Sequence, residues 1–348
     1  MTKQREFWID AIKGLGIALM ILGHMFIGPS LKGFIYSFHM PLFVLISGYL
    51  FRADGSAKDL ILRKCKSILL PFLYCNIATL FVRLALLTVS GSFTPEGALG
   101  IARMQALMTL GANSSYKTIM EYVESSGPVW YLPFIFNIQI LFILFAKIYK
   151  KKSRIGNMLE LCAVLLLGYA GYHIGTKIAY LLWSFDASLV GLIVFYVGIK
   201  LREHRFFEQK YATPVSLVLG LFWIIAQPKI GFTVFATRDY FYYPLCIILA
   251  LAACIFVVFL VRLTEIRLKL TPLLKPLAWC GRHSLLILII HAIEFVHINW
   301  IESIQYKLQN QVLSYILYMT IIIGLTWGFL LFRKLVRHVT KNFLNINK

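Results

Sequence analysis

The chain has 348 residues, of which 59% are hydrophobic and 14% are charged, and its formal net charge is +20. Long apolar runs recur from one end to the other, which is typical of a membrane protein with several spans and excludes an ordinary soluble enzyme. The basic excess does not indicate nucleic-acid binding, because Lys and Arg stand in blocks beside the ends of apolar runs, where topology and anionic headgroups account for them.

The apolar runs predict an all-α polytopic bundle of about ten transmembrane helices. We expect these helices at residues 7–28, 33–53, 66–90, 129–149, 157–177, 183–201, 212–228, 240–262, 281–300 and 312–332. One integral membrane domain would then cover residues 1–348, with an external loop at about 91–128 and a basic cytoplasmic tail at about 333–348. Residues 96–110 of this loop are expected to form a short helix that lies on or dips into the membrane. A connection of this length is often a binding loop or lid, and an ordinary surface crossover is the alternative.

The distribution of Lys and Arg predicts the orientation of the bundle. Six alternate segments hold 26 of these 35 residues, whereas the intervening loops hold seven. Positive residues concentrate on the cytoplasmic side, so both termini are predicted to be cytoplasmic. The six basic segments are 1–6, 52–66, 147–154, 200–210, 262–282 and 333–348.

The first predicted helix carries charged and titratable side chains in the stretch DAIKGLGIALMILGH, residues 10–24. Lys13 and His24 are eleven residues apart, which places them on one helix face, about 16 Å apart along the axis. Asp10 lies one turn before Lys13 and can pair with it. A lysine that snorkels to the headgroups is the alternative for Lys13.

A second histidine follows in FHMPLFVLISGYLF. His39 and His24 would lie at similar depth if the first two helices are antiparallel, and Pro41 can open its helix locally and free backbone groups. Imidazole exchanges protons near neutral pH, so both histidines are candidates for acid/base chemistry. A histidine in a satisfied interhelical hydrogen bond is the alternative for each.

A further polar stripe, HAIEFVH, lies in the ninth predicted helix. Its members His291, Glu294 and His297 recur every three residues, about 60° apart around the helix. Glu294 would be costly facing lipid, so we expect it to face the interior, outer water or a partner. Interior packing is the alternative for His291.

Three charged residues stand near outer helix ends, namely Asp186, Arg238 and Asp239. We expect them to lie in solvated loops, and contact with a sugar is the alternative. The cysteines show no CxxC or metal-type spacing, so we predict no metal site and no permanently bound cofactor.

Taken together, WIDAIKGLGIALMILGH and FHMPLFVLISGYLF resemble the opening of the membrane acyltransferase family 3, particularly its fucose 4-O-acetylase-like and polysaccharide O-acetyltransferase branch. Lys13 and His24 match the family's Arg/Lys-x10-His motif. The stretch LRKCKSILLPF, 62–72, resembles the family's Arg-rich cytoplasmic segment, although Ser67 stands where a second Arg is often found. VWYLPFIF, 129–136, and GRHSLLILIIH, 281–291, resemble later segments of the family.

The resemblance implies transfer of an acetyl or related acyl group from cytoplasmic acyl-CoA to a hydroxyl of an envelope glycan or lipid-linked sugar, in a bacterial cytoplasmic membrane. His24 would be the general base or form an acyl-histidine, with His39 orienting it or donating to the oxyanion, and His291 a further catalytic candidate. Cations near the cytoplasm would hold the donor's phosphates, and a topogenic role is their alternative. These cations are Lys13, Arg63, Lys64 and Lys66, and the acceptor-binding candidates are Glu294, Trp130 and Tyr131.

Intramembrane His, Lys and Glu are also what a proton-coupled transporter or a translocator of lipid-linked sugars would use. We find no inverted repeat or matching pair of broken helices in the two halves, which counts against transport. A structural scaffold fits poorly with charged groups placed along the first helix. Dependence on acyl-CoA separates the enzyme from both rivals.

Overall fold

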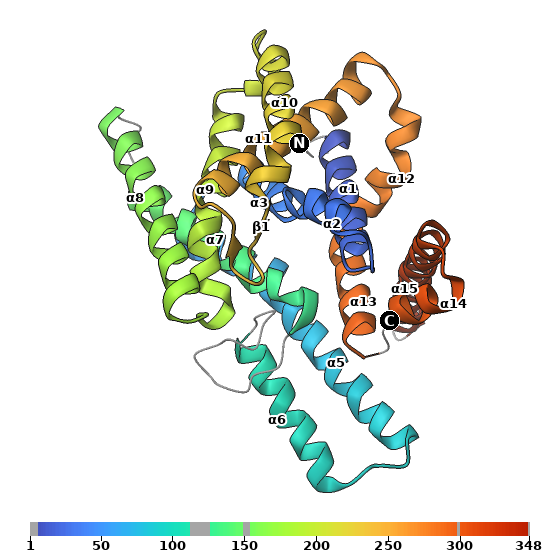
Figure 1. Ribbon diagram of the computed structural model, residues 1–348. Coiled ribbons are helices and arrows are strands. Elements are labelled where there is room, and N and C mark those ends of the chain that lie inside the picture. Colours follow the sequence, from blue (N-terminus) through green and yellow to red (C-terminus); the bar gives the residue numbers. More distant parts are fainter. Residues whose placement is uncertain (1–5, 112–125, 149–153, 298–299, 347–348) are drawn as a thin grey trace. The chain divides into compact units, whose positions relative to one another are not determined.

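The computed structural model describes residues 6–111, 126–148, 154–297 and 300–346. It is almost entirely helical, with one two-residue antiparallel strand pair (Figure 1). The chain forms two compact parts, one of residues 1–27 and 273–348 and the other of residues 28–272, and each is described by itself. The expected all-α fold is confirmed.

The first part contains the N-terminal helix and the C-terminal helices. Its elements are α1 (Phe7–Gly23), α12 (Thr271–Arg282), α13 (Ser284–His297), α14 (Trp300–Leu308) and α15 (Gln311–Ile346). The second part contains the remaining α-helices and the strand pair. Its elements are α2 (Pro29–Tyr36), α3 (His39–Leu50), α4 (Ala57–Lys64), α5 (Leu70–Val89), α6 (Pro95–Gly111), α7 (Tyr131–Ile148), α8 (Arg154–His173), α9 (Phe185–Glu203), α10 (Ala212–Ile230), β1 (Thr233–Val234), β2 (Asp239–Tyr240) and α11 (Leu245–Arg262).

Short 3-10 and π turns extend several of these helices. The 3-10 turns are Gly127–Trp130, Leu182–Ser184 and Phe206–Glu208, and the π turns are Cys65–Leu69, Ile174–Ile178 and Leu263–Arg267. Within the described residues, eight helices are long and apolar enough to cross a membrane, or nine if the bent pair α12 and α13 is one span. Helix α1 is apolar but slightly shorter, at 17 residues, which is the lower limit for a span.

Two predicted boundaries differ from the structure for local reasons. The second predicted helix is broken at residues 37–38, before Pro41, and His39 begins α3. The predicted tail is instead the end of α15, which continues to Ile346 because no Gly or Pro follows Gly328. The helix expected at 96–110 is present as α6, while residues 112–125 of the same loop lie outside the described residues.

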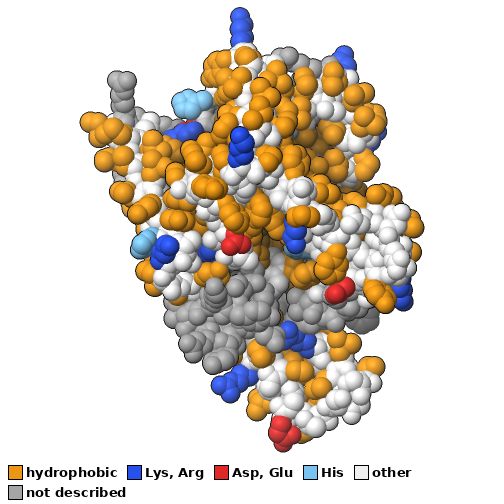
Figure 2. All heavy atoms as spheres, in the orientation of Figure 1, with side chains coloured by type: hydrophobic (Ala, Val, Ile, Leu, Met, Phe, Trp, Pro, Cys, Tyr) orange, Lys and Arg blue, Asp and Glu red, His pale blue; other side chains and the backbone are white. Residues whose placement is uncertain are grey.

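The core of the second part is built around α9, most of whose residues are buried on all sides. Gly48 of α3 and Gly198 of α9 lie against backbone carbonyls of the facing helix, so the two backbones approach closely. Helices α5, α8, α10 and α15 instead leave many large apolar side chains exposed, and hydrophobic side chains cover much of the face seen in Figure 2. Such apolar surfaces suit a lipid environment.

The expectation that Asp186 and Arg238 lie in solvated loops is wrong. Arg238 donates to both oxygens of Asp186, from Nε at 2.7 Å and from Nη2 at 2.9 Å, and both side chains are buried. The Tyr180 ring packs under the guanidinium at 4.1 Å, and Gly175 leaves the room that the pair needs. The ion pair therefore ties the start of α9 to the β1–β2 connection, whereas Asp239 is exposed, as expected.

We predict that Asp186→Asn destabilises the fold, because it leaves the Arg238 guanidinium buried without its carboxylate. Losing one partner of a buried pair costs about 3–5 kcal/mol. Thermal unfolding of purified protein in detergent should show a clearly lower melting temperature. The matched control is Asp239→Asn, whose effect should stay within about 0.5 kcal/mol. Equal melting temperatures for the Asp186→Asn and Asp239→Asn variants would contradict a stabilising role for the ion pair.

Candidate functional site

His24 lies at the end of α1, where its ring meets α13 within the first part. Its Nδ1 is 2.8 Å from Nε2 of His291, and the two rings lie 5.1 Å apart, nearly parallel at 17°. The Phe295 ring packs against both imidazoles, and its centroid is 5.0 Å from that of His24 and 5.5 Å from that of His291. Two of the three histidines predicted to be catalytic are thus in direct contact.

The contact continues as a chain of hydrogen bonds into the interior. Nδ1 of His291 is 2.7 Å from the hydroxyl of Tyr318 on α15, and this hydroxyl donates to the carboxylate of Glu294. The other Glu294 oxygen accepts the backbone N–H of Trp300, at the start of α14. His291, Glu294 and Tyr318 are all buried, so the chain joins four helices away from solvent.

The chain has a direction, because a phenol carries one proton. When Glu294 is a carboxylate, it accepts the hydrogen bond that the Tyr318 hydroxyl donates, so the Tyr318 oxygen in turn accepts from the Nδ1–H of His291. The Nε2 of neutral His291 then carries a lone pair and accepts from the Nδ1–H of His24. This assignment leaves the Nε2 of neutral His24 unprotonated, which is the form that a general base needs.

Close packing and several hydrogen bonds hold α1 in place beside this chain. Gly14 lies against the backbone carbonyl of Leu277, and Gly281 against that of Asp10, so α1 and α12 touch backbone to backbone. The Tyr315 hydroxyl also donates to the carbonyl oxygen of Ala18 at 3.1 Å. A histidine at the end of so firmly held a helix has a defined position.

Lys13 and Asp10 lie near the opposite end of α1. The helix is unbroken from Phe7 to Gly23, so the separation of about 16 Å expected between Lys13 and His24 applies. The buried Asp10 carboxylate is 3.8 Å from Nε of Arg282 at the end of α12, a partner that the sequence did not indicate. Lys13 is half-buried.

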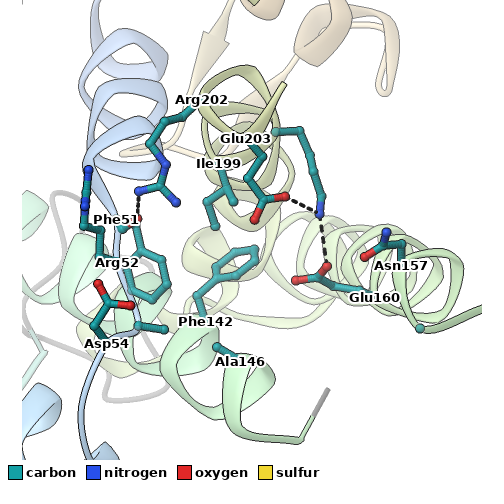
Figure 3. Close-up of a pocket in the computed structure, with 13 residues that line it drawn as sticks. Phe51, Arg52, Asp54, Phe142, Ala146, Asn157, Glu160, Ile199, Arg202 and Glu203 are labelled. Carbon is teal, nitrogen blue, oxygen red and sulfur yellow. Dashed lines mark hydrogen bonds and ion pairs between the residues drawn. The ribbon is translucent and has the colours of Figure 1, made fainter. Parts of the chain in front are cut away.

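The other predicted phosphate-binding residues belong to the second part. Arg63 and Lys64 end α4, Lys66 lies in the π turn that follows, and Arg63 donates to the Asp54 carbonyl at 3.3 Å. Asp54 also lines a pocket of about 540 Å³ at the ends of α3, α7, α8 and α9 (Figure 3). Arg52 and Arg202 reach this pocket, in segments predicted to be cytoplasmic.

The charges of this pocket are balanced. Three acidic and three basic side chains line it, and Lys200 is bound by Glu160 at 3.4 Å and by Glu203 at 3.0 Å. Arg202 donates to the Phe51 carbonyl, as Figure 3 shows. The pocket is therefore amphiphilic, with the apolar rings of Phe51 and Phe142 beside its charges, rather than strongly cationic.

His39, Trp130 and Tyr131 also lie in the second part. The buried His39 ring bonds through Nδ1 to the Ile35 carbonyl at 2.9 Å, across the break between α2 and α3. Pro41 would free the carbonyl of residue 37, four positions before it, so the carbonyl that His39 satisfies is a different one at the same helix break. Trp130 is buried 5.3 Å from Phe134, and Tyr131 packs against the same ring at 5.7 Å.

Sequence reasoning missed Tyr318, which joins His291 to Glu294. Its surroundings, SYILYMTIII, are those of an ordinary apolar helix, and nothing in that pattern distinguishes Tyr318 from Tyr315. The available signal was indirect: a buried Glu294 needs a donor, and a tyrosine on another helix is one of the few side chains that can reach it.

Comparison with known proteins defines the class to which this fold and site belong. A family model described as an acyltransferase domain matches residues 6–331, nearly the whole chain. A search of curated protein sequences gave no significant match. The protein belongs to the acyltransferase 3 family and is a multi-pass membrane acyltransferase. Membership of this family supports acyl transfer rather than the alternative of a proton-coupled transporter or translocator.

We predict that Gly14→Ala destabilises the packing of α1, because the added methyl group would overlap the Leu277 carbonyl. Overpacking of this kind costs about 1–3 kcal/mol. The matched control is Gly324→Ala on α15, where nothing lies within 4 Å of the new methyl group and alanine favours the helix. The melting temperature in detergent should fall for Gly14→Ala and not for Gly324→Ala. An unchanged melting temperature for Gly14→Ala would disprove the close contact.

Proposed function

We propose that the protein is an O-acyltransferase of a bacterial cytoplasmic membrane, moving an acyl group from cytoplasmic acyl-CoA to a hydroxyl of an envelope glycan or lipid-linked sugar. Acetyl-CoA is the donor that we propose first. The hydrogen bonds that run from His24 through His291 and Tyr318 to Glu294 carry the proposal. They prepare one imidazole nitrogen of His24 as a base, in a protein whose family transfers acyl groups.

In the proposed reaction, Nε2 of His24 removes the proton of the acceptor hydroxyl as its oxygen attacks the thioester carbonyl carbon. The tetrahedral intermediate collapses, the carbon–sulfur bond breaks, and the imidazolium returns the proton to the leaving thiolate. An ester and free coenzyme A are formed. An acyl-histidine on His24 is the competing route.

His291, Tyr318 and Glu294 would support His24 without touching the reacting atoms. They hold Nδ1 of His24 protonated and its ring in one orientation, and the Glu294 carboxylate stabilises the positive charge that reaches the imidazole pair. The same logic operates where a carboxylate orients a catalytic histidine, here extended by a second imidazole and a phenol. Glu294 is thus better explained as a positioning residue than as the acceptor contact expected from sequence.

The cations near predicted cytoplasmic helix ends are each proposed to bind the donor's phosphates, namely Lys13 in the first part, and Arg63, Lys64 and Lys66 in the second. A phosphate group pairs well with such cations, and the flexible arm of coenzyme A lets its thioester lie far from them. His39 suits the oxyanion role less well than expected. Its Nδ1–H is used by Ile35, so the neutral ring presents a lone pair at Nε2 and donates there only when protonated.

The first test of the proposed function compares the parent with His24→Ala at matched membrane abundance. Mass spectrometry would measure alkali-releasable acyl ester on envelope glycans of cells that produce either form. Loss of a general base lowers the rate roughly 10²- to 10⁴-fold, so ester should appear with the parent and vanish with the variant. Equal ester with both forms would remove His24 from the mechanism, and ester with neither would count against O-acylation.

A second test uses Tyr318→Phe, which keeps the ring and removes the hydroxyl that joins His291 to Glu294. Breaking a buried hydrogen bond costs about 1–3 kcal/mol, so we expect kcat to fall roughly 10- to 100-fold with little change in the KM of the donor. Tyr315→Phe is the matched control, since it also loses one hydrogen bond on the same helix but lies outside the chain. Equal loss in both variants would indicate a general structural effect.

A further inference from the structure

We propose that a polar pocket between α14, the start of α15 and the end of α1 binds the acceptor sugar, as a pyranose ring. This assignment rests on the proposed function for the class of ligand, and on the geometry of the first part for its place. The pocket measures about 330 Å³, within the range of small-molecule sites and large enough for one sugar residue. It lies in segments that the charge distribution predicts to be external.

The side chains around this pocket match a ligand covered with hydroxyl groups. Amides from Gln305, Gln309, Asn310 and Gln311 line it, together with the Glu302 carboxylate. An amide both donates and accepts, as a sugar hydroxyl does, and a carboxylate accepts strongly. A set of neutral amides with one acid favours a neutral polyhydroxyl ligand over a phosphate, which would require cations.

Two of the amides are fixed by the turn that follows His24. Gln305 accepts from the backbone N–H of Phe26 at 2.9 Å and donates to its carbonyl at 3.2 Å, and Gln311 donates to the same carbonyl at 3.1 Å. Each amide has two N–H groups and two lone pairs, so these contacts use part of its capacity. The remaining donors and acceptors are held in place for a ligand.

A buried hydroxyl among the residues that line the pocket gives independent evidence for a ligand. Ser314 is fully buried, and its Oγ has no hydrogen-bond partner within the part of the chain that the structure describes. An unsatisfied buried hydroxyl is costly, and residues that line a pocket can receive the missing bond from its occupant. A sugar hydroxyl supplies both a donor and an acceptor.

The pocket also lies next to the histidine chain. Ser314 is four residues before Tyr318, one turn of α15, so the two side chains lie on the same face of the helix, about 6 Å apart along its axis. Phe26 follows His24 by two residues. Two of the residues that line the pocket, Phe26 and Ser314, are thus close in the chain to members of the hydrogen-bonded chain that includes the proposed base.

Two exposed rings complete the match to a pyranose. Tyr306 is 83% exposed and Phe26 is 66% exposed, and both line the pocket. A pyranose has an apolar face of C–H bonds that packs on an aromatic ring, while its hydroxyls point to the rim. Exposed rings beside amides are therefore expected of a sugar site.

The test measures binding without the acyl donor, so that its result does not depend on catalysis. Purified full-length protein would be irradiated with a panel of diazirine-bearing methyl glycosides of glucose, galactose and N-acetylglucosamine. Peptide mass spectrometry would then locate the label. We expect at least one glycoside to label residues 302–314, and excess diazirine-free glycoside to compete. Labelling elsewhere, uncompeted labelling, or no labelling by any glycoside would overturn the assignment.

Variants make the test specific. Tyr306→Ala and Ser314→Ala should each reduce competable labelling roughly three- to tenfold, the effect of one lost stacking or hydrogen-bonding contact. The control is Lys307→Ala. Lys307 follows Tyr306 in α14 but does not line the pocket, so this variant should be labelled to the same extent as the parent. Equal loss in all three variants would overturn the ligand contacts assigned to Tyr306 on α14 and Ser314 on α15.

One further variant separates this inference from the proposed function. His24→Ala removes the proposed base and leaves the residues that line the pocket, so competable labelling of residues 302–314 should persist while no ester forms. Labelling in His24→Ala with no ester from the parent would keep the sugar site and reject the proposed chemistry. Ester formation by the parent with labelling only outside 302–314 would keep the chemistry and reject this acceptor site.

Discussion

The hydrogen bond between the two imidazoles of His24 and His291 is the interaction on which the site depends. It joins segments 267 residues apart and continues through one phenol to one carboxylate. Inside a membrane bundle no bulk water can replace a missing partner, so every polar group in such a chain must find its partner in the protein. The packing of the helices therefore fixes both the position of the two imidazoles and the ring nitrogen of each that carries hydrogen.

The proposed role of His24 as a general base fits the tight packing of α1 in the first part. A general base is effective when its nitrogen lies within hydrogen-bond reach of the proton that it removes, and small displacements are costly. Backbone contacts at Gly14 and Gly281 hold one end of α1, and the hydrogen bonds at Phe26 hold the other. His24 lies just after the last turn of a helix restrained at both ends, which limits its freedom without burying it completely.

The sequence predicted individual elements better than their pairings. Apolar runs located most helix ends within a few residues, with the end of α15 as an exception, because the cost of exposing a backbone to lipid leaves few alternatives. As polar residues in otherwise apolar helices, His24, His291 and Glu294 could be identified from the sequence. The contact between the two histidines could not, since side chains distant in sequence meet only through the packing of whole helices. For the same reason Asp186 and Arg238, 52 residues apart, were expected in solvent and instead form a buried pair.

Helix α15 has a consequence for the depth of the site. At 36 residues it is about 54 Å long, well beyond the hydrocarbon thickness of about 30 Å, and it continues unbroken from the Tyr318 level to its basic end. Tyr318 precedes Arg333 by fifteen residues, or about 22 Å of rigid helix. Arg333, Lys334 and Arg337 favour the anionic headgroups of the cytoplasmic surface. The length of helix between them and Tyr318 therefore fixes the distance of the Tyr318 hydroxyl from that surface.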